Sequence, residues 1–361
     1  MITDFVWESF ALETTAYAYD AFYDYMATDP DLIAFLQKKG MPIADAGELR
    51  GYIEEYIFRA AMVGLLDGRI KGNEGLHQAA ALAVALVMDD YSDTHPNSKD
   101  LVDYAYHGLG QSAHILVNGL ARDGGGHESP NYNRIKRKFI RVAQLMEEVR
   151  TRRPDEYPRE RYPDIFADPK ARGLFDYFID ITILDTFLPS IGDCGGIGKP
   201  SRNQARHRRY SSLTYENLYA FSRYGDPRYA RAATTFAGEP FAGSLWEPYP
   251  AEAIQNALAQ PESAIKRESR LLDGYGVAIL ESGEWPRNRA AMLNYTSTVG
   301  HWQQDPLMLQ LFARGVTLLP DLGYPRTDDY RYDWDANSLA HNTVTVNETP
   351  PVWLSFRNGA R

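Results

Sequence analysis

The hydrophobic pattern of this chain changes once, and that change constrains the fold more than any other feature. Up to about Gln260, apolar residues recur every three or four positions, as in Leu49–Leu66, which is typical of amphipathic helices. After Ile265 the pattern becomes short β-rich runs separated by glycine, proline and asparagine. The switch predicts a helical domain over residues 1–262 and an antiparallel β-domain over residues 263–361.

The helical half is expected to contain consecutive helices without intervening strands. Asp29 and Pro30 are typical of an N-cap followed by proline at the first helical position. Further helices are expected at Leu49–Leu66, Gly72–Met88, Leu101–Ala121, Asn133–Arg150, Leu174–Leu184, Tyr210–Tyr224 and Asp226–Phe236. Consecutive helices that pair antiparallel without intervening strands predict a bundle, a solenoid or a closed helical toroid.

The β half contains runs whose lengths and spacings predict an antiparallel sheet. The expected strands are Tyr275–Glu281, Ala290–Thr296, Leu307–Ala313, Val316–Leu319 and Thr343–Val346.

Composition excludes several classes of protein. A net charge of −10 makes the chain as a whole a poor electrostatic partner for nucleic acid or an anionic membrane. The longest apolar run, Ala79–Met88, is about half the length of a membrane span. No signal peptide precedes Asp4, and the single cysteine, Cys194, forms no intrachain disulfide and leaves the compartment open.

Two polar segments come at the expected starts of helices. Asn73 and His77 are four residues apart, so on a helix they share one face; the alternative is an N-cap asparagine and a half-buried histidine. In the loop Asp123–Tyr132, three glycines would let a ligand approach the backbone, and His127, Glu128 and Tyr132 supply titratable groups. A flexible turn followed by a solvated basic face is the alternative there.

A second glycine-rich loop, Ile191–Gly198, contains Asp193 and is followed by a cationic segment. The segment could hold an anionic ligand, although charge runs are usually solvated surface. Its arginines include Arg202, Arg206 and Arg209.

Three polar junctions border the expected strands in the β half. They are Gly300–Asp305 with His301, Leu319–Pro325 with Asp321, and Ser338–Val346 with His341. A histidine just before a strand is commonly structural, but three such junctions within about forty residues favour a functional origin.

These junctions resemble the heparinase II/III-like polysaccharide lyases, which include oligoalginate and heparin lyases. The family carries a Gly-His-x-His-x-Asp stretch, an Asp-x-Gly-Tyr turn and a His-Asn-Thr-Val strand, and similar pieces occur here in that order. The pieces Asn-x-x-x-His-Gln, Asp-Gly…Glu-Ser-Pro-x-Tyr and Gly-Asp-x-Gly-Gly are similar to motifs of the family's helical toroid. The resemblance spans roughly residues 70 to 346.

The resemblance implies an α+β multidomain fold: an incomplete (α/α) toroid followed by an antiparallel β-sandwich-type domain, with a cleft between them. Because relatives carry more helices and strands, it also implies that this chain is a truncated piece of a longer periplasmic or secreted protein. The implied activity is β-elimination on a uronic-acid-containing polysaccharide, which requires no cofactor. The acidic polysaccharide is the implied partner, with neither nucleic acid nor membrane involved.

The family's site residues transfer by motif position. Tyr132 would be the acid that protonates the leaving oxygen, and in some members this tyrosine is also the base; His301 would be the base or its partner. Asn73 and His77 would contact the substrate carboxylate. Substrate binding would also involve His127, Glu128, which orients its neighbours, and Asp193; by charge alone, Arg202, Arg206 and Arg209 would grip anionic sugars.

The chain departs from the family pattern at two positions. In zinc-bearing members a histidine stands where this chain has Gln303, and that histidine holds the metal with the equivalents of Asp321 and His341. Glutamine is a poor zinc ligand, so a hydrogen-bonded Gln303–Asp321–His341 cluster is favoured over a structural zinc. The family's Tyr-His pair is Tyr132-Asn133 here, which leaves the substrate open.

Two other functions remain open at this point. A toroid glycoside hydrolase would need two carboxylates across a cleft, and Glu128 and Asp193 are the candidate pair. A non-catalytic relative that binds acidic glycans is suggested by the change at Gln303.

Overall fold

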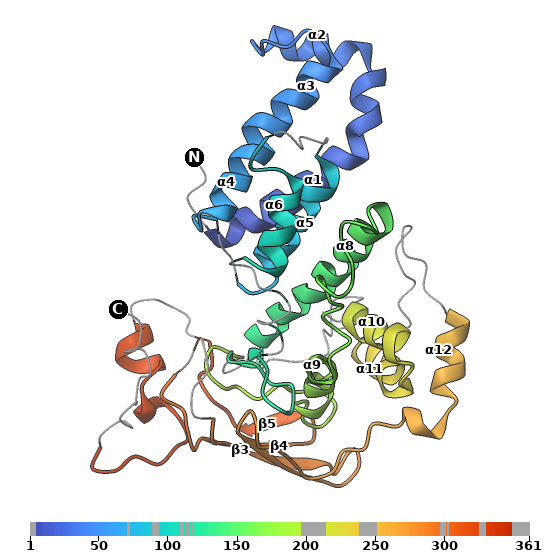
Figure 1. Ribbon diagram of the computed structural model, residues 1–361. Coiled ribbons are helices and arrows are strands. Elements are labelled where there is room, and N and C mark those ends of the chain that lie inside the picture. The colour runs from blue at the N-terminus through green and yellow to red at the C-terminus, as the bar shows by residue number, and fades with distance from the viewer. Residues whose placement is uncertain are drawn as a thin grey trace. The chain divides into compact units, whose positions relative to one another are not determined.

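The computed structural model describes residues 5–70, 73–88, 94–108, 112, 116, 118–195, 214–237, 251–296, 301, 303–324 and 330–348. The chain forms two compact units, one of residues 1–118 and 135–168, the other of residues 119–134 and 169–361. Helices make up the described part of the first unit, whereas the second combines helices with an antiparallel sheet (Figure 1). The expected α+β class is therefore confirmed, and the domain boundary at residues 262/263 stays a prediction.

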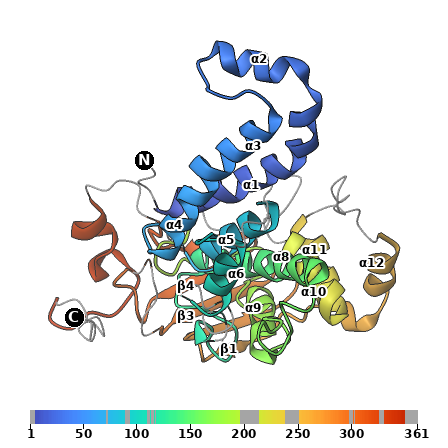
Figure 2. The same ribbon diagram turned by 45° about the horizontal axis from the view of Figure 1, so that its top comes forward.

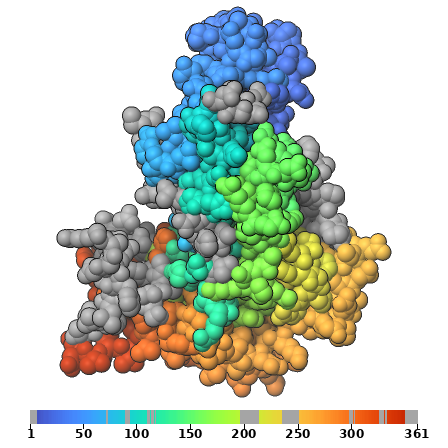
Figure 3. Space-filling view, viewed as in Figure 1, coloured from blue at the N-terminus to red at the C-terminus, as the bar shows by residue number. Residues whose placement is uncertain are grey.

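The first unit is built around one apolar helix. Its helices are α1 (Phe5–Thr28), α2 (Pro30–Lys38), α3 (Ala46–Ile53), α4 (Ala60–Leu66), α5 (Leu76–Val87), α6 (Ser98–Tyr106) and α8 (Lys138–Arg152). Helix α5 contacts α1, α6 and α8 (Figure 2). Its stretch Ala79–Val84 is almost completely buried because small alanine side chains let the neighbouring helices approach closely. Figure 3 shows cyan residues of the first unit packed against green residues.

Local sequence signals explain where several of these helices begin and end. The predicted cap at Asp29 is confirmed, since its carboxylate accepts a hydrogen bond from the Asp31 N–H at 2.9 Å. The predicted helix Leu49–Leu66 forms, with a π-helical segment Glu54–Arg59 between α3 and α4. The predicted helix Leu101–Ala121 is wrong in length: α6 ends at Tyr106, where the next two N–H groups both bond to the Asp103 carbonyl.

The second unit combines helices with a five-stranded sheet among its described residues. Its helices are α9 (Pro169–Asp180), α10 (Thr214–Tyr224), α11 (Pro227–Ala237) and α12 (Ala251–Leu258). Its strands are β1 (Arg270–Leu272), β2 (Val277–Ser282), β3 (Arg289–Asn294), β4 (Leu309–Ala313) and β5 (Val316–Leu319). They pair antiparallel in chain order.

The sheet has one buried face and one exposed face. Along β2, Val277 and Ile279 are completely buried while Leu280 is 65 % exposed, as strand alternation requires. Phe312 of β4 packs on Phe187, with ring centroids 5.2 Å apart, which joins the buried face to the segment after α9. The exposed face also carries apolar side chains, among them Leu271, Leu293 and Leu309.

The predicted strand Thr343–Val346 is wrong. The segment forms no strand beyond an isolated β-bridge at Val346, and Val344 and Val346 are each 71 % exposed. Valine and threonine favour strands only where a partner strand and a buried face are present, and this segment has neither among the described residues.

Candidate active site

The loop Asp123–Tyr132 is fixed against the sheet domain by hydrogen bonds. The Asp123 carboxylate accepts from the Tyr275 N–H at 2.9 Å, and the Tyr275 hydroxyl donates to the Glu128 carbonyl at 2.9 Å. Gly124 has φ +80°, and a Cβ there would lie 1.7 Å from the Gly173 carbonyl oxygen. Gly124 therefore allows close packing within the protein, while the expected approach of a ligand to this loop and the alternative of a flexible turn stay predictions.

Tyr132, His301 and Glu128 come together at the end of this loop. Tyr132 begins the 3₁₀ helix Tyr132–Arg137, and its ring stacks on the imidazole of His301 with centroids 3.6 Å apart and planes 8° apart. The Glu128 carboxylate lies 2.8 Å from Nδ1 of His301. The fold thus brings together an imidazole, a phenol and a carboxylate from segments far apart in the sequence.

The backbone of His301 is held in an uncommon conformation. Its φ is +52°, in the left-handed region that costs a non-glycine residue energy. The Asp193 N–H donates to the His301 carbonyl at 2.8 Å, and a Cβ at Gly192 would lie 2.5 Å from the same oxygen. The second glycine-rich loop therefore holds His301 in place through its backbone.

This arrangement suits acid–base chemistry. With Nδ1 directed at the Glu128 carboxylate, the favoured neutral tautomer carries its proton on Nδ1 and leaves the Nε2 lone pair free to accept a proton. The side chains of His301 and Glu128 are about one-third exposed, so a substrate could reach them. Tyr132 contributes a phenolic O–H beside the imidazole.

Other predicted site residues of the second unit lie in different surroundings. His127 is exposed. The Asp193 side chain is buried and accepts a hydrogen bond from Nε2 of Gln303 at 3.0 Å, so its carboxylate supports the protein rather than facing solvent. Arg202, Arg206 and Arg209 lie outside the described residues.

Asn73 and His77 belong to the first unit, and their expected helical relationship is wrong. Helix α5 begins at Leu76, and its N-cap is Gly75 with φ +91°, not Asn73. The Gly75 N–H bonds to the Gln78 side chain at 2.8 Å, and a Cβ at Gly75 would lie 2.9 Å from Lys138. Asn73 therefore precedes the helix, while His77 is buried within it.

The residues do not fit the zinc site that the family resemblance implies. His341 Nδ1 lies 2.7 Å from Asp321, and Nε2 of Gln303 donates to Asp193 and to the Gly323 carbonyl. In the described part of the chain, no three His, Cys, Asp or Glu side chains are grouped as a metal site requires. Gln303 Oε1 and His341 Nε2 are buried without a hydrogen-bond partner. Hydrogen bonds with the Asp321 and Gln303 side chains instead hold the turn at Gly323. The expected cluster differs in one respect, because Gln303 bonds to Asp193 and Gly323 and not to the Asp321–His341 pair.

Two neighbours of the site were not singled out from the sequence. The hydroxyls of Tyr132 and Tyr324 are 3.2 Å apart, and Tyr324 is the last residue of the Asp-x-Gly-Tyr motif. Asp305 accepts a hydrogen bond from the Gly192 N–H at 2.7 Å, and burial raises the pKa of this carboxyl to about 7. Tyr324 could have been selected as a site residue because it ends the Asp-x-Gly-Tyr motif. For Asp305, the sequence offers only its position in the Gly-His-x-His-x-Asp stretch.

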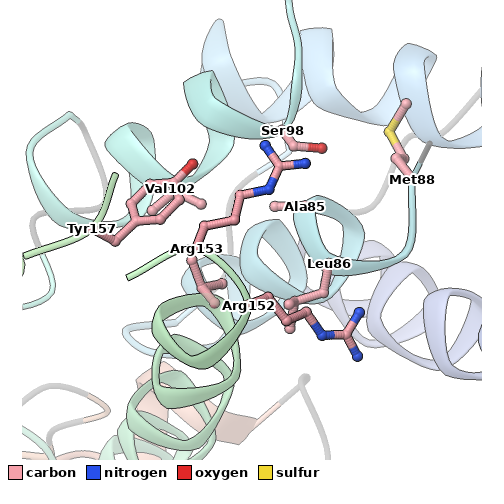
Figure 4. A pocket seen from close by; sticks show the side chains of 9 residues that line it. Ala85, Leu86, Met88, Ser98, Val102, Arg152, Arg153 and Tyr157 are labelled. Carbon is pink, nitrogen blue, oxygen red and sulfur yellow. The ribbon is translucent and has the colours of Figure 1, made fainter. Parts of the chain in front are cut away.

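The first unit contains a small pocket of about 110 Å³ (Figure 4). Ala85, Leu86, Met88, Ser98, Val102, Val149, Arg152, Arg153 and Tyr157 line it. The Arg153 side chain extends toward Ser98, and Arg152 lies by Leu86. Its described lining offers two guanidinium groups and the phenol of Tyr157 but neither a carboxylate nor an imidazole, so it lacks the carboxylate–imidazole pair found beside Tyr132.

None of the described helices has the length and apolar character needed to cross a membrane.

Comparisons with known proteins agree with the motif resemblance. Residues 265–361 match the family model described as heparinase II/III-like, C-terminal. No curated protein matches the chain.

Solved structures with a similar fold include a heparinase III and a heparan sulfate lyase. A heparinase III (BT4657 gene product, with methylated lysines) has a TM-score of 0.59 at 15 % identity, over 95 % of this chain and 44 % of that chain. The heparan sulfate lyase HepC from Pedobacter heparinus has a TM-score of 0.53 at 16 % identity, over 87 % of this chain and 43 % of that chain. This chain thus spans less than half the length of either structure. The fold of this chain is similar to that of these two structures, and its residues 265–361 match the heparinase II/III-like, C-terminal family model, in agreement with the motif resemblance.

Proposed function

We propose that this chain is part of a polysaccharide lyase that cleaves a uronic-acid-containing polysaccharide by β-elimination and leaves an unsaturated sugar. The observation that carries the proposal is the stacked Tyr132–His301 pair with Glu128 on Nδ1 of the imidazole. The fold likeness and the C-terminal family match support the same class of enzyme.

β-Elimination requires a base and an acid close together. In the proposed reaction Nε2 of His301 removes the proton from the carbon next to the uronate carboxylate. The electron pair of that C–H bond forms the new C=C bond, and the bond to the glycosidic oxygen breaks. The Tyr132 hydroxyl then protonates that oxygen. Glu128 stabilises the imidazolium that forms on His301.

The substrate carboxylate must be neutralised for its neighbouring proton to become acidic. We assign this task to Asn73 and His77 by motif position, and we assign binding of flanking anionic sugars to Arg202, Arg206 and Arg209. Because the similar structures are named heparinase III and heparan sulfate lyase, heparan sulfate is the first substrate to test. From the family resemblance we also propose a periplasmic or secreted location.

The hydrolase alternative has less support. It needs two carboxylates facing a substrate, but Asp193 is buried and bonded to Gln303, and Glu128 is bonded to His301. A role in binding glycans without cleaving them is an outcome that the activity test distinguishes.

The test is the growth of ultraviolet absorbance from a conjugated double bond on incubation with heparan sulfate, heparin and alginate. Tyr132→Phe and His301→Ala should each abolish the signal without lowering thermal stability. Full activity in both variants would overturn the site assignment. New reducing ends without the chromophore would favour a hydrolase, and saturable binding without product would favour a non-catalytic glycan binder.

A further inference from the structure

We propose that Tyr324 is a positioning residue whose hydroxyl stabilises the phenolate formed on Tyr132 when that residue gives up its proton. The proposal rests on the function proposed above and adds a residue that acts through Tyr132. Its basis is the contact between the two phenols and the buried cluster that holds the Tyr324 turn.

The two phenols are close enough for a direct hydrogen bond. Their hydroxyl oxygens are 3.2 Å apart, and their rings lie 15° from parallel with centroids 6.3 Å apart. Tyr324 is 45 % exposed, so its hydroxyl can exchange protons with solvent. The titratable groups that the described contacts place around Tyr132 are thus His301, Glu128 behind it, and Tyr324.

A buried network fixes the turn that carries Tyr324. The Tyr324 N–H donates to the Gly195 carbonyl at 2.9 Å. The preceding residue, Gly323, accepts from Nε2 of Gln303 through its carbonyl and donates its N–H to Asp321 at 2.8 Å. Asp321 is bonded in turn to His341, and both of these side chains are completely buried.

The network explains what the zinc-associated motif positions do in this chain, where glutamine replaces one histidine. Asp321 and His341, which the resemblance connects with zinc, here hold the Gly323 N–H side of the turn through hydrogen bonds. Gln303 holds the carbonyl side through its amide N–H. The side chains therefore fix the position from which Tyr324 reaches Tyr132.

A hydroxyl can change from acceptor to donor without losing its proton. While Tyr132 is protonated, its O–H can donate to the Tyr324 oxygen. When Tyr132 transfers that proton to the glycosidic oxygen, the Tyr324 O–H rotates and donates to the new phenolate. Tyr324 keeps its own proton throughout, so the only proton transferred in this step passes from Tyr132 to the glycosidic oxygen. The bond strengthens as charge develops on Tyr132, and it therefore favours the transition state over the bound substrate.

The decisive variant is Tyr324→Phe, which keeps the ring and removes only the hydroxyl. A hydrogen bond to a charged group contributes enough to lower kcat about tenfold, with KM nearly unchanged. The alkaline limb of the kcat profile, where Tyr132 loses its proton, should move up by about one pH unit. The matched control is Tyr56→Phe, at an exposed tyrosine of the first unit, and it should change neither quantity.

A readout that needs no turnover separates this proposal from the lyase proposal. The tyrosinate absorbance lost through Tyr132→Phe gives the ionisation of Tyr132, measured once in the wild-type background and once with Tyr324→Phe. We expect Tyr132 to ionise about one pH unit higher without the Tyr324 hydroxyl. Unchanged ionisation, or a lower kcat without a shift of the alkaline limb, would overturn the role of Tyr324. If ionisation shifts but no uronan yields an unsaturated product, the proposed function alone fails.

Discussion

Removing the Glu128 carboxylate tests how the candidate base is held. In Glu128→Ala the His301 Nδ1 loses its partner at 2.8 Å, so the imidazole can rotate and can carry its proton on either nitrogen. Glu128→Gln keeps an oxygen that can accept from Nδ1–H but removes the negative charge. The pair of variants therefore separates orientation from charge.

The size of the effect follows from the kind of bond and its exposure. A hydrogen bond to a charged group contributes about 1.5–3 kcal/mol when it is well buried. His301 and Glu128 are about one-third exposed, so solvent weakens the bond and about 1–2 kcal/mol is reasonable. Glu128→Ala should therefore lower kcat/KM about 5- to 30-fold, and Glu128→Gln should lower it less.

The assay is the initial rate of ultraviolet absorbance on the substrate that the wild type cleaves best, measured across pH. Thermal unfolding of each variant controls for misfolding, because the Tyr275–Glu128 bond uses the Glu128 backbone and survives both substitutions. Wild-type kcat/KM in Glu128→Ala at every pH would refute the orienting role of this carboxylate.

Three further predictions concern the support of the site. Gln303→Leu should lower the free energy of unfolding by about 2–5 kcal/mol, measured with urea, because it removes the buried hydrogen bonds from the Gln303 amide to the Asp193 carboxylate and the Gly323 carbonyl; wild-type stability would contradict the supporting role of the amide. The pKa of Asp305 is about 7 in the folded protein, which is above its value in the unfolded chain. The contribution of Asp305 to stability is therefore greatest below pH 4, where its carboxyl is protonated in both states. The free energy of unfolding should fall by about 4 kcal/mol as the pH rises through 7. Asp305→Asn should remove that pH dependence in urea titrations at pH 4, 6 and 8, and an unchanged dependence would assign it to other groups. Gly124→Ala should destabilise the protein by more than about 1 kcal/mol in thermal unfolding, because its Cβ would meet backbone at 1.7 Å, and an unchanged melting temperature would contradict the packing of this loop.

Elements whose stability depends on local pattern were predictable from the sequence. The cap at Asp29 and the strand Val316–Leu319 both form where expected, because a side-chain acceptor or a strand with a nearby partner suffices. The strand predicted at Thr343–Val346 fails because pairing depends on a partner that local sequence does not reveal.

Only the site residues that belong to family motifs could be predicted from the sequence. Motif position selected Tyr132, Glu128 and His301, and the fold brings these three together. The burial of Asp193 and the contact of Tyr324 with Tyr132 depend on packing between segments far apart in the chain. No periodicity or spacing in the sequence encodes those contacts.

The most direct test of the account is the mass of the product formed from heparan sulfate by this chain. At each cleavage, β-elimination predicts that the fragment with the new non-reducing end is lighter by one water than after hydrolysis and carries the double bond, and that these fragments are lost completely in His301→Ala. New non-reducing ends that carry the added water and lack the double bond would contradict the account.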